Sequence, residues 1–260
     1  MSWFEAFILG IIQGLTEFLP ISSTGHLYLG RHLFGLDDAG LYLDTMLHMG
    51  TLLAVFVFYK RELWHIIRHP FSKLTGLLVI GTLPAVAIGL LFKDYFDSIS
   101  KSGLTIGWEF LATGLLLWFG DSVKNGYKKM DHISYGDAFF IGSFQAAAIF
   151  PAVSRSGLTM VAALMRKLDR ETAAYFSFLL STPAICGAVL LQLKDVVTGE
   201  VEQLSVFFLF VATLSSALFG YVAVKWMINY LKHHSLKTFA IYVWILGAVV
   251  LVCQFTGVFR

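Results

Sequence analysis

Six long apolar stretches dominate this chain, and each is close to the length that a helix needs to cross a bilayer. They cover residues 41–59, 74–92, 104–120, 173–192, 205–230 and 238–258. A spanning helix needs about 20 mainly apolar residues, and helices satisfy every backbone hydrogen bond in lipid. Only 14% of the residues are charged, against roughly 25% in soluble domains, and the mean hydropathy is +0.73. The sequence therefore predicts an all-α integral membrane protein with six transmembrane helices.

Two further apolar stretches, 4–19 and 138–150, are too short to span the hydrocarbon core. The first runs into residues 20–25 and the second into residues 151–157, and both breaks are rich in Pro, Ser and Gly. Irregular backbone at membrane depth is tolerated only where protein or a water-filled cavity covers it. Both stretches are therefore predicted to form re-entrant helix–loop–helix hairpins.

The chain reads as a repeat. A shift of 132 residues aligns the two breaks without a gap, and the spans follow at offsets between 131 and 134. The identical pairs are Gly10 and Gly142, Gln13 and Gln145, Phe18 and Phe150, Ser22 and Ser154, and Gly25 and Gly157. Each half holds one hairpin and three spans, so the second half starts on the opposite side. We predict one membrane domain, 1–260, made of inverted-topology repeats 1–125 and 133–260, with a binding site at their interface.

Basic residues predict how the chain is oriented. Twelve Lys and Arg residues fall on one side of the predicted spans and five on the other. The richer segments are 60–73, 121–137, 166–172 and 231–237; the poorer ones are 31–40, 93–103, 193–204 and Arg260. Because cytoplasmic loops carry the excess of Lys and Arg, both termini and the first hairpin are expected on the outside. A net charge of +2 gives no reason to expect nucleic acid as a partner.

The first break concentrates polar side chains. Gln13 and Glu17 are four residues apart and share one helix face. A carboxylate near the bilayer centre costs roughly 2.5–3.5 kcal/mol on insertion scales, so it needs a partner or a cavity. The break also contributes four further polar groups: Ser22, Ser23, Thr24 and His26. The alternative is a purely structural role for both residues. Glu17 would then accept hydrogen bonds from hydroxyls and helix ends, and His26 would be a buried core histidine with its hydrogen bonds satisfied.

The second break suits a phosphate. Arg155 is flanked by Ser154 and Ser156, Thr159 follows one turn later, and a short helix begins here. A guanidinium can fork onto two phosphate oxygens, and the amides at a helix N-terminus point at an anion. The alternative is an Arg155–Glu17 ion pair with a structural role alone.

Three more ionisable residues lie within the predicted spans. Asp44 and His48 are four residues apart, and they either extend the polar site or bridge helices. Glu109 is expected to make a structural hydrogen bond to a neighbouring helix. Without any Walker, zinc or dinucleotide motif, the residues alone indicate a membrane protein that binds a phosphorylated ligand. They do not separate an enzyme from a transporter.

Two motifs resemble the signatures of the undecaprenyl-diphosphate phosphatases of the bacitracin-resistance type. Residues 13–27, with Pro-Ile-Ser-Ser-Thr-Gly-His after Glu17, resemble the first, and residues 151–159 resemble the second. Segments 47–54 and 81–85 also look like parts of this family, so the resemblance covers essentially the whole chain. Gln13 stands where many members have Glu. Ala152 replaces the usual Gly of the second signature, which would stiffen that turn.

The resemblance implies an enzyme that removes one phosphate from undecaprenyl diphosphate, recycles the lipid carrier for cell-wall synthesis and lowers bacitracin susceptibility. It implies a plasma-membrane location, a site facing the periplasm or exterior, and a divalent cation, Mg²⁺ or Ca²⁺. Arg155 would clamp the phosphate with Ser154, Ser156 and Thr159, and Glu17 with Gln13 would hold the metal. Ser22 and Thr24 are expected to contact phosphate too.

Three nucleophiles are compatible with these residues: Ser23 activated by His26, His26 itself, or metal-bound water. We favour Ser23 with His26. The main rival function is a lipid-phosphate flippase using the same site, because inverted repeats suit alternating access. The expected partners are the polyprenyl diphosphate lipid and the bilayer, with a homodimer as an additional option.

Overall fold

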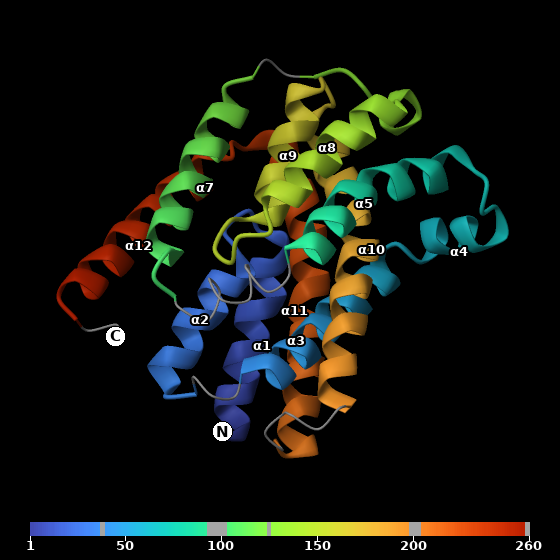
Figure 1. Cartoon of the computed structure of the whole chain (residues 1–260). Coiled ribbons are helices and arrows are strands. Elements are labelled where there is room, and N and C mark those ends of the chain that lie inside the picture. Colours follow the sequence, from blue (N-terminus) through green and yellow to red (C-terminus); the bar gives the residue numbers. More distant parts are fainter. Residues whose placement is uncertain (37–39, 93–102, 124–125, 198–203, 258–260) are drawn as a thin grey trace.

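The computed structural model describes residues 1–36, 40–92, 103–123, 126–197 and 204–257 and is built from helices (Figure 1). The α-helices are α1 Trp3–Phe18, α2 Ser23–Phe34, α3 Gly40–Phe58, α4 Lys60–Arg68, α5 Lys73–Leu91, α7 Ile106–Asp121, α8 Tyr135–Ala147, α9 Arg155–Met165, α10 Arg170–Val197, α11 Val206–His233 and α12 Lys237–Phe255. A short 3-10 helix, η2, covers Met130–His132. Within the described residues, extended pairing is limited to an isolated bridge between Lys128 and Leu168. The all-helical prediction is confirmed.

Both predicted breaks are present. Helix α1 ends at Phe18, and α2 begins after Ser22, whose side chain accepts a hydrogen bond from the backbone N–H of Gly25. Helix α8 ends at Ala147, and α9 begins after Ser154, which caps it in the same way. A Ser at the N-cap satisfies one of the free amides of a helix start. The same local chemistry therefore opens the second helix of each hairpin.

The predicted spans correspond to α3, α5, α7, α10, α11 and α12. Among the described residues, four helices are long and apolar enough to cross a membrane: α5, α10, α11 and α12. A fifth span results if α3 is counted together with α4, to which it is bent by 79°. Helix α7 has only 16 residues, about 24 Å at 1.5 Å per residue. The chain is thus a multi-pass membrane protein, with α7 shorter than a full span.

Segment 60–68, predicted as part of a loop, is the amphipathic helix α4, which has no buried residue. Trp64 and Ile67 are exposed on it, and the Arg68 guanidinium lies 4.8 Å from the centre of the Trp64 ring. Exposed aromatic and apolar side chains beside basic ones are typical of a helix that lies in a membrane interface.

The helices pack in pairs: α1 against α11, α3 against α11, α5 against α8, and α7 against α12. Glycine allows the close approach in several of these pairs, as two examples show. A Cβ on Gly142 of α8 would lie 2.0 Å from the carbonyl oxygen of Gly81 on α5, and a Cβ on Gly14 of α1 would lie 2.6 Å from that of Ser216 on α11. Small residues let helix backbones approach in a membrane. Under the predicted repeat, α1 corresponds to α8 and α11 corresponds to α5, so the α1–α11 contact corresponds to the α8–α5 contact. The inverted orientation of the two halves stays a prediction.

Ion pairs join the segments at one end of the bundle. Asp137, in the first turn of α8, accepts hydrogen bonds from Lys128 and Arg166. Burial alone would raise the pKa of Asp137, but the hydrogen bonds from Lys128, Ser134 and Arg166 hold it well below its usual range. This end carries much of the basic charge predicted for the cytoplasmic side. Residues 93–102, 198–203 and Arg260, which belong to the predicted outside segments, lie outside the described residues.

Candidate active site

The two breaks are joined to each other through hydroxyl groups. Ser22 Oγ donates a hydrogen bond of 3.1 Å to the carbonyl oxygen of Pro151, in the second break. In return, Ser156 Oγ donates one of 3.1 Å to the carbonyl oxygen of Leu19, in the first. Each hydroxyl thus satisfies a backbone carbonyl on the opposite side of the junction, and the two breaks lie against each other.

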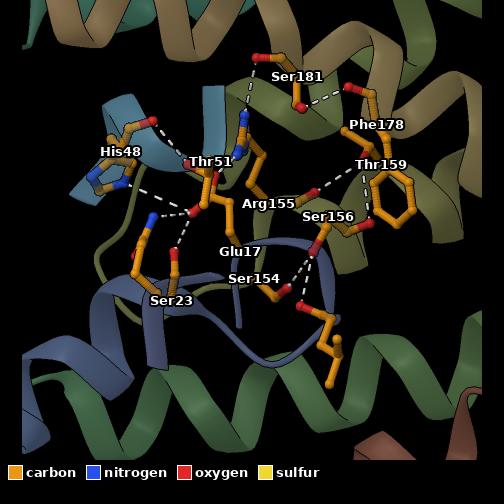
Figure 2. Close-up of polar contacts among 12 residues, drawn as sticks. Glu17, Ser23, His48, Thr51, Ser154, Arg155, Ser156, Thr159, Phe178 and Ser181 are labelled. Atoms are coloured by element: carbon orange, nitrogen blue, oxygen red, sulfur yellow. Dashed lines mark hydrogen bonds and ion pairs between the residues drawn. The ribbon is translucent and has the colours of Figure 1, made fainter. Parts of the chain in front are cut away.

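Glu17 is the centre of this junction, and its side chain is 3% exposed. Its Oε1 pairs with the Arg155 guanidinium. Its Oε2 accepts hydrogen bonds from Ser23 Oγ at 2.5 Å and from Gln13 Nε2 at 3.0 Å. Figure 2 shows Glu17 between Arg155 on one side and Ser23 on the other. The carboxylate therefore has the partners that its burial requires.

Arg155 is the first residue of α9, and its second amino group, Nη1, donates to the carbonyl oxygen of Ser181 on α10 at 3.3 Å. Its side chain is 21% exposed. A guanidinium with a single carboxylate partner and access to a cavity can exchange that partner for phosphate oxygens. Phosphate binding at Arg155 and release of Glu17 would then be one event.

A cavity of about 410 Å³ opens over these groups, within the range of roughly 300–1,000 Å³ for ligand pockets. Its polar lining comes from Thr16, Glu17, Ser22, Ser23, Thr24, His48, Ser154, Arg155 and Ser156. Helix α10 adds the apolar residues Ala184, Ile185, Ala188 and Leu191. All the predicted phosphate-binding residues line the cavity except Thr159, whose hydroxyl donates to the carbonyl oxygen of Arg155 at 2.9 Å.

Residues 6–249 match the family described as bacitracin resistance protein BacA. The chain belongs to this family. It is 71% identical over 259 residues to undecaprenyl-diphosphatase 4 of Bacillus cereus, with all of both chains covered. It is 45% identical to the undecaprenyl-diphosphatase of Carboxydothermus hydrogenoformans, again over the full length of both. It is 41% identical to that of Halothermothrix orenii, over 97% of this chain and 98% of the relative.

In this BacA family member, His26 is not the partner of Ser23. His26 Nδ1 lies 2.7 Å from the carbonyl oxygen of Ser22, and Nε2 lies 2.8 Å from the Tyr242 hydroxyl. Because a carbonyl oxygen can only accept, Nδ1 carries the proton and a neutral ring receives the Tyr242 hydrogen at Nε2. The Tyr242 ring also stacks on His26. The Ser23–His26 contact required by our favoured nucleophile hypothesis is thus absent from this geometry.

His48 is the histidine that lines the cavity. Its Nδ1 lies 2.8 Å from the carbonyl oxygen of Asp44, one turn earlier, and its Nε2 is 3.8 Å from Glu17 Oε2. Asp44 and His48 were expected either to extend the polar site or to bridge helices, and His48 extends the polar site. Asp44 pairs with Arg31 and bridges α2 to α3. The four-residue spacing predicted a shared face, but it did not predict which residue would reach Glu17.

Glu109 makes a structural hydrogen bond, as expected, but its partner lies in the second break and not on a neighbouring helix. Its Oε2 accepts a hydrogen bond from the backbone N–H of Ala152, so α7 holds the second break in place. Thr113, one turn further along α7, accepts one from the N–H of Ser154 at 3.2 Å. The roles of Thr113 and Tyr242 are not predictable from the sequence, since nothing in the local pattern connects either residue to a distant break.

The described residues contain no group of three or more His, Cys, Asp or Glu side chains that could hold a metal ion. Several buried acceptors nevertheless receive no hydrogen bond, and Gln13 Oε1 is the one next to the Glu17 carboxylate. It belongs to the same amide whose nitrogen contacts Glu17. An amide oxygen beside a carboxylate suits a hard cation such as Mg²⁺ or Ca²⁺, whose ligands are oxygens.

Proposed function

We propose that this chain hydrolyses undecaprenyl diphosphate to undecaprenyl phosphate and inorganic phosphate. The observation that carries the proposal is the contact between Glu17, Ser23 and Arg155, which unites an acid, a hydroxyl and a cation inside a cavity of a membrane protein. The names of the relatives point to the same substrate. By recycling the lipid carrier, the activity would support cell-wall synthesis and lower bacitracin susceptibility.

In the proposed reaction, the terminal phosphate displaces Glu17 from Arg155. The freed Glu17 takes the Ser23 proton, since the two groups are already hydrogen-bonded at 2.5 Å. The bond from Ser23 Oγ to the terminal phosphorus forms as the bond from phosphorus to the bridging oxygen breaks, which releases undecaprenyl phosphate. Water then attacks the phosphoserine, inorganic phosphate leaves, and Glu17 returns the proton to Ser23 Oγ, which restores the hydroxyl. Arg155 and the serines of the second break neutralise and orient the transferred phosphate.

We prefer Glu17 to His26 as the proton acceptor, because both His26 nitrogens have other partners. A rapid-quench experiment with phosphorus-labelled substrate, followed by mass mapping of residues 20–30, tests this. A phosphoserine at Ser23 supports the proposal, whereas a phosphohistidine would assign the attack to His26. Turnover with neither adduct would assign it to water.

A divalent cation, Mg²⁺ or Ca²⁺, belongs to the proposal. Glu17 and the unpartnered Gln13 Oε1 would hold it together with diphosphate oxygens, since Mg²⁺ is often bound through one or two carboxylates plus substrate phosphates. When bound, it would supply positive charge against the diphosphate. Phosphate release should fall on chelation and return on adding either ion. Gln13→Leu, which keeps the volume but removes the oxygen, should raise the cation concentration needed for half-maximal activity.

We also propose that the protein lies in the bacterial plasma membrane, as two inverted halves with the site open to the outside. The excess of Lys and Arg on the opposite side supports this orientation. The decisive test of function is phosphate release by the purified protein in detergent, with Arg155→Ala as the inactive variant. Release that is unchanged in Arg155→Ala would refute the site, and no release by wild type would refute the function.

A further inference from the structure

An apolar groove of about 670 Å³ lies between α5 and α8, and we call it the α5–α8 groove. Its lining is Leu83, Pro84, Ala87, Ile88, Phe139, Ser143, Ala146, Ala147, Ile149 and Phe150. Ser143 is its only hydroxyl residue, and that hydroxyl donates to the carbonyl oxygen of Phe139 at 2.9 Å. The groove therefore presents hydrocarbon and no free polar group to an occupant.

The groove exists because α5 and α8 separate along their length. They run in the same direction, since Gly76 lies beside Tyr135, Gly81 beside Gly142 and Gly89 beside Ile149. At Gly142 a Cβ would lie 2.0 Å from the Gly81 carbonyl oxygen, whereas at Gly89 the nearest atom, on Ile149, would be 3.7 Å away. The helices are thus in contact at the crossing and apart near the polar cavity.

The groove and the polar cavity share two residues, Ile149 and Phe150, at the start of the second break. Gly89, next to the groove residue Ile88, also lines the cavity. A ligand with a charged end at Arg155 can therefore extend its apolar part past Ile149 without a gap. In the 132-residue repeat, Ile149 matches Glu17, so the second half places an apolar residue where the first has its carboxylate.

The helix pair that corresponds to it in the predicted repeat, α1 and α11, is closed. A Cβ on Gly10 would lie 2.6 Å from the Ala212 carbonyl oxygen, and one on Gly14 the same distance from that of Ser216. Contact thus persists over more than one turn, and the Ser215 hydroxyl crosses it to the carbonyl oxygen of Phe7. The two corresponding helix pairs differ here, and of the two only α5 and α8 leave room for a chain.

We propose that the α5–α8 groove binds the part of the polyprenyl chain that is attached to the diphosphate; this inference rests on the proposed function. Residues 139–147 of α8 extend over roughly 12 Å at 1.5 Å per residue, so the groove takes only the first isoprene units and the rest of the chain lies in the bilayer. Chain length should matter for the first few units and not beyond them.

Substitutions that fill the groove test this. Ala87 and Ala147 are small, exposed residues of its lining, so Ala87→Trp and Ala147→Trp fill it without overpacking the core. Val86→Trp is the matched control, because Val86 is an exposed neighbour on α5 outside the groove. The substrates are dimethylallyl, farnesyl and undecaprenyl diphosphate. The first carries one isoprene unit and the second carries three.

We expect the two groove variants to lower kcat/KM for farnesyl and undecaprenyl diphosphate by about tenfold, the scale of a lost apolar pocket contact. The loss should appear as a higher KM with kcat unchanged, because the contact is equal in ground and transition states. Dimethylallyl diphosphate turnover, and all three activities of Val86→Trp, should match wild type. An equal loss for all three substrates, or no loss at all, would overturn the groove assignment.

Wild-type protein provides a second measurement that needs no variant. Farnesyl diphosphate with a diazirine at the far end of its chain should label residues 83–88 or 139–147 upon illumination, and added undecaprenyl diphosphate should suppress the labelling. Adducts confined to the apolar α10 side of the cavity would instead place the chain along Ile185 and Leu191. If wild type hydrolyses none of the three diphosphates, the proposed function fails; normal hydrolysis with unaffected groove variants refutes only the groove.

Discussion

Removing either member of the Glu17–Arg155 pair should damage both activity and stability, to different extents for the two residues. Each of Glu17→Ala and Arg155→Ala should lower phosphate release at least about a hundredfold, the scale of losing a preorganised electrostatic group. Breaking a buried pair from one side costs about 3–5 kcal/mol, because a charge is left without its partner. The Arg155 side chain is 21% exposed and that of Glu17 only 3%. We therefore expect about 3 kcal/mol for Glu17→Ala and nearer 5 kcal/mol for Arg155→Ala.

The double variant distinguishes a true pair from two independent residues. With both charges removed, no uncompensated charge remains, so its loss of unfolding free energy should fall short of the sum of the single losses by at least about 2 kcal/mol. Equilibrium unfolding in one detergent measures all three variants. Arg170→Ala serves as the control, because it breaks the distant Arg170–Asp121 pair and should destabilise the protein without lowering phosphate release per folded molecule. Strictly additive losses would show that Glu17 and Arg155 do not interact.

Three further outcomes are expected. Ser23→Ala should abolish the phosphoserine and lower phosphate release about a hundredfold, whereas His26→Ala should retain adduct formation; equal, complete loss of the adduct in both would restore His26 as the base. A cysteine placed in 93–103 should react with an impermeant thiol reagent from outside, and one in 60–73 should need permeabilised cells; the opposite pattern would reverse the topology. Asp137→Asn should destabilise the protein near neutral pH, and its deficit relative to wild type should shrink below about pH 4, as the lowered pKa of Asp137 requires; a pH-independent deficit would contradict that assignment.

Local patterns predicted the parts of this molecule that depend on neighbours in sequence. The breaks after Phe18 and Ala147 follow from Pro, Ser and Gly, and the Ser caps follow from helix termini. Helix α4 was missed although its pattern was visible: Trp64 and Ile67 are three residues apart, with Arg61 and Arg68 near them. The orientation argument used only the number of basic residues in 60–73 and took the whole segment as a loop, so this helical periodicity was not considered.

The partners that cross the chain could not be predicted from one sequence. His26 meets Tyr242, 216 residues away, and spacing along the first break indicated Ser23 as its nearest candidate. Ser23 begins α2 and His26 lies three residues on, a spacing at which helix side chains can meet. The Ser23 hydroxyl donates instead to Glu17, and His26 Nδ1 is bonded to the carbonyl oxygen of Ser22. That bond turns the ring toward α12. Tyr242 lies on α12, and the packing of α12 against α7 places its hydroxyl within hydrogen-bonding distance of His26.

The predicted repeat assigns the two charged members of the site, Glu17 and Arg155, to different halves of the chain. Under the 132-residue shift, Glu17 matches Ile149 and Ser23 matches Arg155, so corresponding positions carry different and complementary groups. Glu17 without Arg155 would be a buried carboxylate lacking its cation, which is costly at membrane depth. The hydroxyls of Ser22 and Ser156 also need backbone carbonyls from the opposite break. Packing of the two breaks against each other therefore assembles the site, and substitutions at this junction should affect folding and catalysis together.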